Sequence, residues 1–119
     1  MDNRSIGAKY EEIAMDYLIK KGYIELGKNY YSRYGELDLI CKDKEKGEIV
    51  FVEVKYRRNS QYGNGLESIT RSKQRKLVKT ALVYLEEKKI KDIPYRFDII
   101  SILGEEIEHI KNAIWGDCL

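Results

Sequence analysis

The chain has 119 residues, of which 43% are hydrophobic and 35% are charged, and its net charge is only +2. This length and composition are typical of one globular domain, so residues 1–119 are taken as a single domain. We expect neither a membrane-spanning helix nor a secretory leader, because no run of about 18 apolar residues occurs and the first residues lack the order of a signal. The two cysteines form no CxxC motif, which argues against a disulfide framework or a cysteine-rich zinc site and favours a reducing cytoplasm.

The first half of the chain is predicted to form one helix and three strands. Apolar residues recur at helical spacing over residues 5–21, with Ser5 as a cap and Gly22 as a left-handed end. The predicted strands cover residues 23–33, 36–41 and 48–57. The charged segment 42–48 is a hairpin connection in which Gly47 suits a positive φ. Three consecutive strands with short connections indicate an antiparallel meander.

The second half is predicted to form a long helix and two further strands. A glycine-containing loop over residues 58–66 precedes a helix over residues 69–89. Strands follow at residues 94–102 and 105–110. The resulting order is αβββαβ(β), and the long helix between strands favours a crossover to a parallel neighbour. We therefore predict an α/β or α+β fold in which a mixed sheet is flanked by helices on both sides.

Charge is distributed unevenly along the sequence. Residues 55–79 carry eight basic residues and one acid, a net charge of +7, whereas the rest of the chain carries −5. The basic residues are Lys55, Arg57, Arg58, Arg71, Lys73, Arg75, Lys76 and Lys79. A focused positive region on a nearly neutral protein suits a polyanion such as nucleic acid. The alternative is a solvated helix face joined to a charged loop.

Two acids fall at paired positions of the predicted hairpin. Asp38 and Glu53 are almost opposite each other when the connection is centred near residue 45 or 46, which puts their Cβ atoms about 5 Å apart on one face. Carboxylates at that separation repel unless a cation lies between them or one takes a proton. Mg²⁺ would satisfy both because it prefers oxygen ligands. Lys55 projects to the same side, and the alternative is a surface network in which Lys55 bridges the two acids.

One acid of the first predicted helix also faces the sheet. At about 100° per residue, Glu11 lies at the edge of the apolar arc, whereas Glu12 and Asp16 point to water. A partly buried carboxylate needs a partner. The sequence leaves that partner open between a metal cluster and a basic residue such as Lys55 or Arg33.

Other polar residues have either two possible roles or a structural role only. Gln74 lies in the apolar stripe of the second helix, beside Lys73, and either hydrogen-bonds a strand end or contacts a phosphate. Arg96 and Asp98 share a strand face, so they either pair or add Asp98 to the acidic cluster. His109 is the only histidine and is expected to be structural. A single histidine argues against nucleases with several histidines and against a Ser-His-Asp hydrolase.

The acids also form a recognisable motif. Asp38, followed by the Glu-Val-Lys segment 53–55, resembles the D…(D/E)-x-K signature of restriction-endonuclease-like nucleases, although Leu37 stands where a proline often precedes the Asp. With Glu11 added, the set is most similar to archaeal Holliday-junction resolvases of that superfamily. Longer stretches resemble the YraN-like bacterial family, in order over nearly the whole chain: GAKYEEIAMDYLIKKGY, NYYSRYGELDLI, VFVEVKYRRN, SKQRKL, YRFDII and IKNAI.

The resemblance implies a restriction-endonuclease-like core and a metal-dependent endonuclease, acting on branched or single-stranded DNA and working as a homodimer. It implies Mg²⁺ or Mn²⁺ within a set of catalytic and metal-binding groups: Asp38, Glu53, Glu11, Lys55 and the Val54 carbonyl. In that set Lys55 stands beside the attacking water. The expected phosphate-binding residues are Arg57, Arg58, Arg71, Lys73, Arg75 and Lys76. Glu36 matches a family position without a role.

Two other functions stay open. One is a nucleic-acid-binding module of the same fold that cuts little or not at all. The other is a structural or partner-binding domain with a surface ion network. Tyr56 and Tyr62 either stack on unpaired bases or pack as ordinary aromatic residues.

Overall fold

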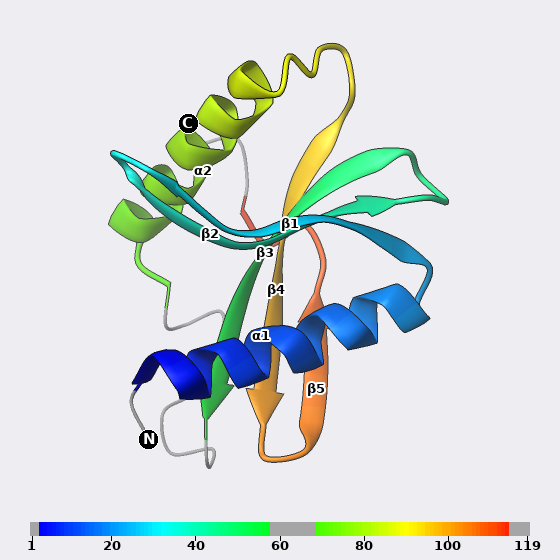
Figure 1. Ribbon diagram of the computed structural model, residues 1–119, viewed down its shortest axis with the longest axis vertical. Coiled ribbons are helices and arrows are strands. Elements are labelled where there is room, and N and C mark those ends of the chain that lie inside the picture. Colours follow the sequence, from blue (N-terminus) through cyan, green and yellow to red (C-terminus); the bar gives the residue numbers. More distant parts are fainter. Residues whose placement is uncertain (1–2, 58–68, 115–119) are drawn as a thin grey trace.

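A computed structural model of the protein describes residues 3–57 and 69–114 (Figure 1). The elements in chain order are α1 (Asn3–Lys20), β1 (Tyr23–Ser32), β2 (Gly35–Asp43), β3 (Glu48–Arg57), α2 (Arg71–Glu87), β4 (Tyr95–Leu103) and β5 (Glu106–Ile110). Every predicted helix and strand is present in the predicted order. The predicted loop over residues 58–66, with Arg58 and Tyr62, lies outside the described residues.

The five strands form one mixed sheet in the order β1-β2-β3-β4-β5. Strands β1, β2 and β3 are antiparallel neighbours, β3 runs parallel to β4, and β5 returns antiparallel to β4. Helix α2 is the crossover between the two parallel strands. The structure therefore confirms the meander, the parallel crossover and the mixed sheet.

Each face of the sheet carries its own hydrophobic cluster. Phe51, which is 1% exposed, packs with α2 residues such as Ala81. Val50 and Val52 pack on the other face with Leu18 of α1. Figure 1 shows the two helices on opposite sides of the sheet. Strand β3 is thus buried on both faces, which explains its run of apolar residues.

Two predicted turn glycines have the expected conformation, and one predicted cap is wrong. Gly22 follows α1 with a φ of 98°, and Gly47 in the β2–β3 turn has a φ of 70°. Both values lie where a residue with a Cβ is strained. Ser5 does not cap α1, because the chain is already helical from Asn3.

Strands β2 and β3 separate at one end. Their backbone pairing runs from Asp43↔Glu48 to Leu39↔Val52 and does not continue to Asp38. The turn between β1 and β2 instead lies against α2, where the hydroxyls of Ser32 and Thr80 are 3.0 Å apart.

This divergence corrects the predicted facing of Leu37. Strict alternation places Leu37 on the face opposite Ile40, yet both side chains belong to the cluster against α2. At Leu37 the strand has left β3 and pairs only with β1, opposite Tyr30.

In the described part of the chain, no helix is long and apolar enough to cross a membrane.

Thr70 caps α2, because its Oγ1 accepts the backbone N–H of Lys73 at 3.1 Å. This N–H has no partner within the helix. We expect Thr70→Ala to lower the free energy of unfolding by about 1 kcal/mol, as measured by urea denaturation. Thr70→Ser keeps the hydroxyl and should retain most of the stability. An alanine variant as stable as the serine variant would contradict the capping role.

Candidate metal centre

Four acidic side chains from three elements meet where β2 and β3 separate: Glu11 of α1, Glu36 and Asp38 of β2, and Glu53 of β3. One carboxylate oxygen from each of Glu11, Glu36 and Asp38 lies within 4.8 Å of the others. The Asp38 carboxyl is also in side-chain hydrogen-bond contact with Glu53. Residues far apart in the sequence therefore form one acidic cluster.

Asp38 lies at the centre of this cluster. Its Oδ2 accepts the backbone N–H of Val54 at 2.9 Å, which brings the main chain of Val54 to the acids. Burial, together with the charge of Glu53, raises the pKa of Asp38 to about 8, although the Val54 N–H opposes the shift. The folded chain alone therefore favours a proton on this carboxyl at neutral pH.

Glu11 reaches the cluster from α1 and is held by a residue that the sequence did not single out. Burial raises the pKa of Glu11, a hydrogen bond with Asn29 opposes this, and the charge of Glu36 adds to it. Asn29 has a φ of 52°, a left-handed conformation that asparagine tolerates better than most residues. In the sequence, the position of Asn29 within a tyrosine-rich strand was the one signal that could have singled it out.

Among the described residues, Glu11 forms neither of the ion pairs that the sequence suggested. None of the ion pairs within residues 3–57 and 69–114 includes Glu11, so neither Lys55 nor Arg33 neutralises it. Arg33 donates instead to the hydroxyl of Tyr34 at 2.7 Å. Glu12 and Asp16 are exposed, as the helical arc predicts.

Two lysines share one oxygen of Glu53, whose side chain is 7% exposed. Nζ of Lys73 lies 2.8 Å from Oε1 and Nζ of Lys55 lies 3.5 Å from the same atom. Burial and the neighbouring Lys73 lower the pKa of Lys55. Burial acts in the same direction on Lys73, but the hydrogen bond to Glu53, the contact with Lys55 and the charges of Glu53 and Asp38 together outweigh it, so the pKa of Lys73 is raised. Lys73 therefore keeps its proton and Lys55 is the more easily deprotonated amine.

The alternative of a surface network bridged by Lys55 does not describe this arrangement. Glu53 is buried, and among the described residues the ion pairs of Lys55 reach Glu53 but not Asp38. Lys73, which the sequence assigned to phosphate binding, is instead paired with an acid of the cluster.

The other described residues that were predicted to bind phosphate are more exposed than Glu53. On the first turns of α2, the exposed residues are Arg71, Arg75 and Lys76. Arg57, at the end of β3, is partly buried. Tyr56 stacks on Tyr10 of α1, with ring centroids 4.3 Å apart and an interplanar angle of 8°. For Tyr56, ordinary aromatic packing is therefore what the structure contains.

Arg96 and Asp98 belong to a different network, at the other end of the hairpin. Arg96 Nε donates to Asp98 at 3.0 Å, and its Nη1 donates to Asp43 at 3.0 Å and to Glu48 at 2.8 Å. Asp98 therefore pairs with Arg96 rather than joining the acidic cluster. Gln74 donates to the carbonyl oxygen of Ile69 at 3.2 Å, just before α2.

Comparisons with known proteins identify a family. The model of "Uncharacterised protein family UPF0102" matches residues 10–102. A UPF0102 protein of Fusobacterium nucleatum subsp. nucleatum is 44% identical over 98% of this chain and 97% of its own length. Relatives from Vibrio parahaemolyticus, at 46% identity over 93% of each chain, and Persephonella marina, at 47% over 90% of each, carry the same family name. These names state no activity, and the matches confirm the family that the quoted motifs indicate.

The raised pKa of Asp38 makes stability depend on pH. In the unfolded chain this carboxyl titrates near its ordinary pKa of about 3.9, and in the folded protein near 8. Between these values the folded state holds a proton that the unfolded state has released. The contribution of Asp38 to the free energy of unfolding therefore decreases as pH rises through this window, and the decrease is complete above about pH 8.

Asp38→Asn should remove this dependence, because an amide oxygen still accepts the Val54 N–H and carries no charge. We expect the variant to be more stable than wild type at about pH 8 and to differ less at about pH 5, in urea denaturation with EDTA. Asp16→Asn, on the exposed face of α1, serves as the control and should change neither value. Equal stability of wild type and Asp38→Asn at about pH 8 would contradict the electrostatic account.

Proposed function

We propose that this chain, which belongs to the uncharacterised protein family UPF0102, also called the YraN family, is a metal-dependent nuclease that hydrolyses phosphodiester bonds. The observation that carries the proposal is the convergence of four carboxylates beside two lysines. Like charges at this separation repel. A divalent cation relieves that repulsion because it binds carboxylate oxygens.

The donor set fits Mg²⁺ or Mn²⁺. All four acidic side chains offer oxygen ligands, which hard cations prefer to nitrogen or sulfur. Within residues 3–57 and 69–114 the cysteine and the histidine lie elsewhere: Cys41 is buried against Met15, and His109 is bonded to Asp98. Glu11, Asp38 and Glu53 would hold the cation, and the structure adds Glu36, whose role the sequence left open.

The chain's own residues supply the rest of the proposed chemistry. A bound divalent cation lowers the pKa of a water and offsets charge on phosphoryl oxygens. Lys55 Nζ, with its lowered pKa, would orient the attacking water. Lys73 Nζ keeps its proton and would place a positive charge beside the phosphate. Arg71 and Arg75, exposed on α2, would bind the phosphate backbone without reading bases.

The proposed substrate is DNA in a branched or single-stranded form. The basic residues lie on the first turns of α2 and suit phosphate contacts that carry no sequence information. The resemblance of Asp38 and the segment 53–55 to the motif of Holliday-junction resolvases supports this choice of substrate. Cutting two strands of a junction needs two such centres, so we propose that two copies of the chain act together.

One observation favours a second candidate function. Two lysines already pair with Glu53, and this neutralises part of the acidic charge without a metal ion. A chain balanced in this way would bind nucleic acid through its basic residues and cut little or not at all.

Metal binding is tested first, without any substrate. Calorimetric titration with Mn²⁺ should detect a saturable site in wild type. Glu53→Gln should lower the affinity roughly tenfold or more, because loss of even a residue that only supports a ligand typically lowers metal affinity by that factor. Glu12→Gln, an exposed acid of α1, is the matched control and should bind as wild type. Absence of saturable Mn²⁺ binding to wild type would overturn the metal centre.

Cleavage is tested with junction, flap and linear DNA in Mg²⁺, Mn²⁺ or EDTA. We expect cutting that needs the metal ion and disappears in both Lys55→Ala and Asp38→Asn, because each change removes a group beside the proposed reacting atoms. Lys20→Ala, an exposed residue at the end of α1, should cut as wild type.

Each other outcome assigns a different function. Cutting that survives both substitutions would come from a contaminating nuclease. Binding without cutting would support the second candidate, and absence of both would leave a structural or partner-binding domain.

A further inference from the structure

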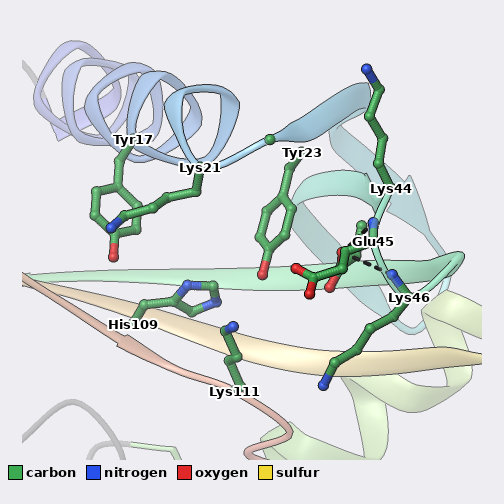
Figure 2. A pocket seen from close by; sticks show the side chains of 10 residues that line it. Tyr17, Lys21, Tyr23, Lys44, Glu45, Lys46, His109 and Lys111 are labelled. Atoms are coloured by element: carbon green, nitrogen blue, oxygen red, sulfur yellow. Dashed lines mark hydrogen bonds between the residues drawn. The ribbon is translucent and has the colours of Figure 1, made fainter.

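A cavity of about 590 Å³ lies far from the acidic cluster, between the end of α1, the start of β1, the β2–β3 turn and the end of β5 (Figure 2). Asp43, the last residue of β2, lines this cavity, whereas Asp38 lies near the middle of the strand. The two residues are five positions apart along the strand, roughly 16 Å at about 3.3 Å per residue. The cavity is therefore a second place on the molecule, distinct from the proposed metal centre.

Positive charge dominates the exposed lining of this cavity. Four lysines contribute: Lys21, Lys44, Lys46 and Lys111. Two acids also line it, Glu45 and Asp43. Asp43 already forms a salt bridge of 3.0 Å with buried Arg96, so its charge is taken up inside the protein. Figure 2 shows the amines of Lys21 and Lys111 near His109, whereas the amine of Lys44 points away from it.

The C-terminus of a helix accounts for the presence of only one of these lysines. The partial negative charge at the C-terminus of α1 favours a cation such as Lys21. Lys111 follows β5, and Lys44 and Lys46 belong to the β2–β3 turn, so no helix end accounts for them. Three separate segments thus bring cations to one cavity.

His109 is fixed inside the cavity. Its Nε2 lies 2.7 Å from Oδ2 of Asp98, and its side chain is 7% exposed. Burial alone would raise the pKa of Asp98, but the hydrogen bonds with His109 and Arg96 lower it. Asp98 is therefore a carboxylate, so Nε2 carries the hydrogen that they share. Nδ1 makes no hydrogen bond within residues 3–57 and 69–114.

Two tyrosines complete the lining. The rings of Tyr17 and Tyr23 stand edge-on to the His109 imidazole, with centroids 6.1 and 5.9 Å away. Arg96 donates to the hydroxyl oxygen of Tyr23 at 2.9 Å, which leaves the hydroxyl hydrogen of Tyr23 to donate elsewhere. Figure 2 shows the amines of Lys21 and Lys111 beside these rings.

We propose that this cavity binds a nucleotide unit through its phosphate group. The amines of Lys21 and Lys111 supply the charge that a phosphate needs, and the hydroxyls of Tyr17 and Tyr23 supply neutral donors. The aromatic rings offer apolar surface to a base or sugar. The volume lies within the range of about 300–1,000 Å³ that is usual for ligand sites. The unit is a free nucleotide or the phosphorylated end of a nucleic-acid chain, which share this chemistry.

The test uses the only histidine of the chain, because its imidazole gives one unambiguous set of side-chain NMR signals. Titration with adenosine 5′-monophosphate at constant ionic strength should shift these signals saturably. Inorganic phosphate should shift them with weaker affinity, and adenosine should not shift them. A 5′-phosphorylated oligonucleotide that acts like the monophosphate assigns the cavity to chain ends, and an inactive one assigns it to free nucleotides.

Matched lysine variants show whether the cavity is the site. Lys21→Ala and Lys111→Ala should each weaken the titration roughly tenfold, the usual effect of losing one charge-assisted hydrogen bond. Lys20→Ala removes the same charge from the neighbouring exposed residue, which does not line the cavity, and should bind as wild type.

The proposal is overturned if the monophosphate gives no saturable shift, if chloride shifts the signals equally, or if Lys20→Ala weakens binding as much as Lys21→Ala does. Asp38→Asn, at the proposed metal centre, should leave the titration unchanged. The nucleotide cavity and the nuclease proposal can therefore fail separately.

Discussion

The site depends on one backbone event, the departure of β2 from β3. Where the ladder between the two strands stops, the Asp38 carboxylate accepts the Val54 N–H in place of a backbone carbonyl. A buried N–H needs a partner, so the side chain of Asp38 is fixed by the same requirement that builds the sheet. Glu11 arrives from one face and Lys73 from the other because the two helices cover opposite faces.

The acids at the two ends of the β2–β3 hairpin differ in whether cationic side chains of the protein balance their charge. At the turn end, Arg96 gathers Asp43, Glu48 and Asp98, so the acids have a permanent cationic partner. At the diverging end, acids outnumber the lysines that contact them, and the pKa of Asp38 rises. Paired buried charges stabilise one arrangement, whereas an excess of one sign leaves room for a cation from solution.

Much of the fold and part of the site followed from local pattern. Along β3, Val50 and Val52 lie on one face and Phe51 on the other, because the side chains of a strand alternate between faces whatever the rest of the chain does. The helical arc correctly brought Glu11 towards the sheet. Alternation failed at Leu37, where β2 has left β3 and pairs only with β1.

The sequence by itself determined the family, the order of the elements and the proximity of the Asp38 and Glu53 side chains, because these depend on periodicity, short turns and motifs that are local in the chain. Only the tertiary structure decided which nitrogen-bearing side chain contacts which acid: Lys73 contacts Glu53, Asn29 contacts Glu11, and Arg96 contacts Asp98. These contacts join residues whose separation in space is set by how the helices pack and the sheet twists. Neither of those geometries is encoded in any single segment.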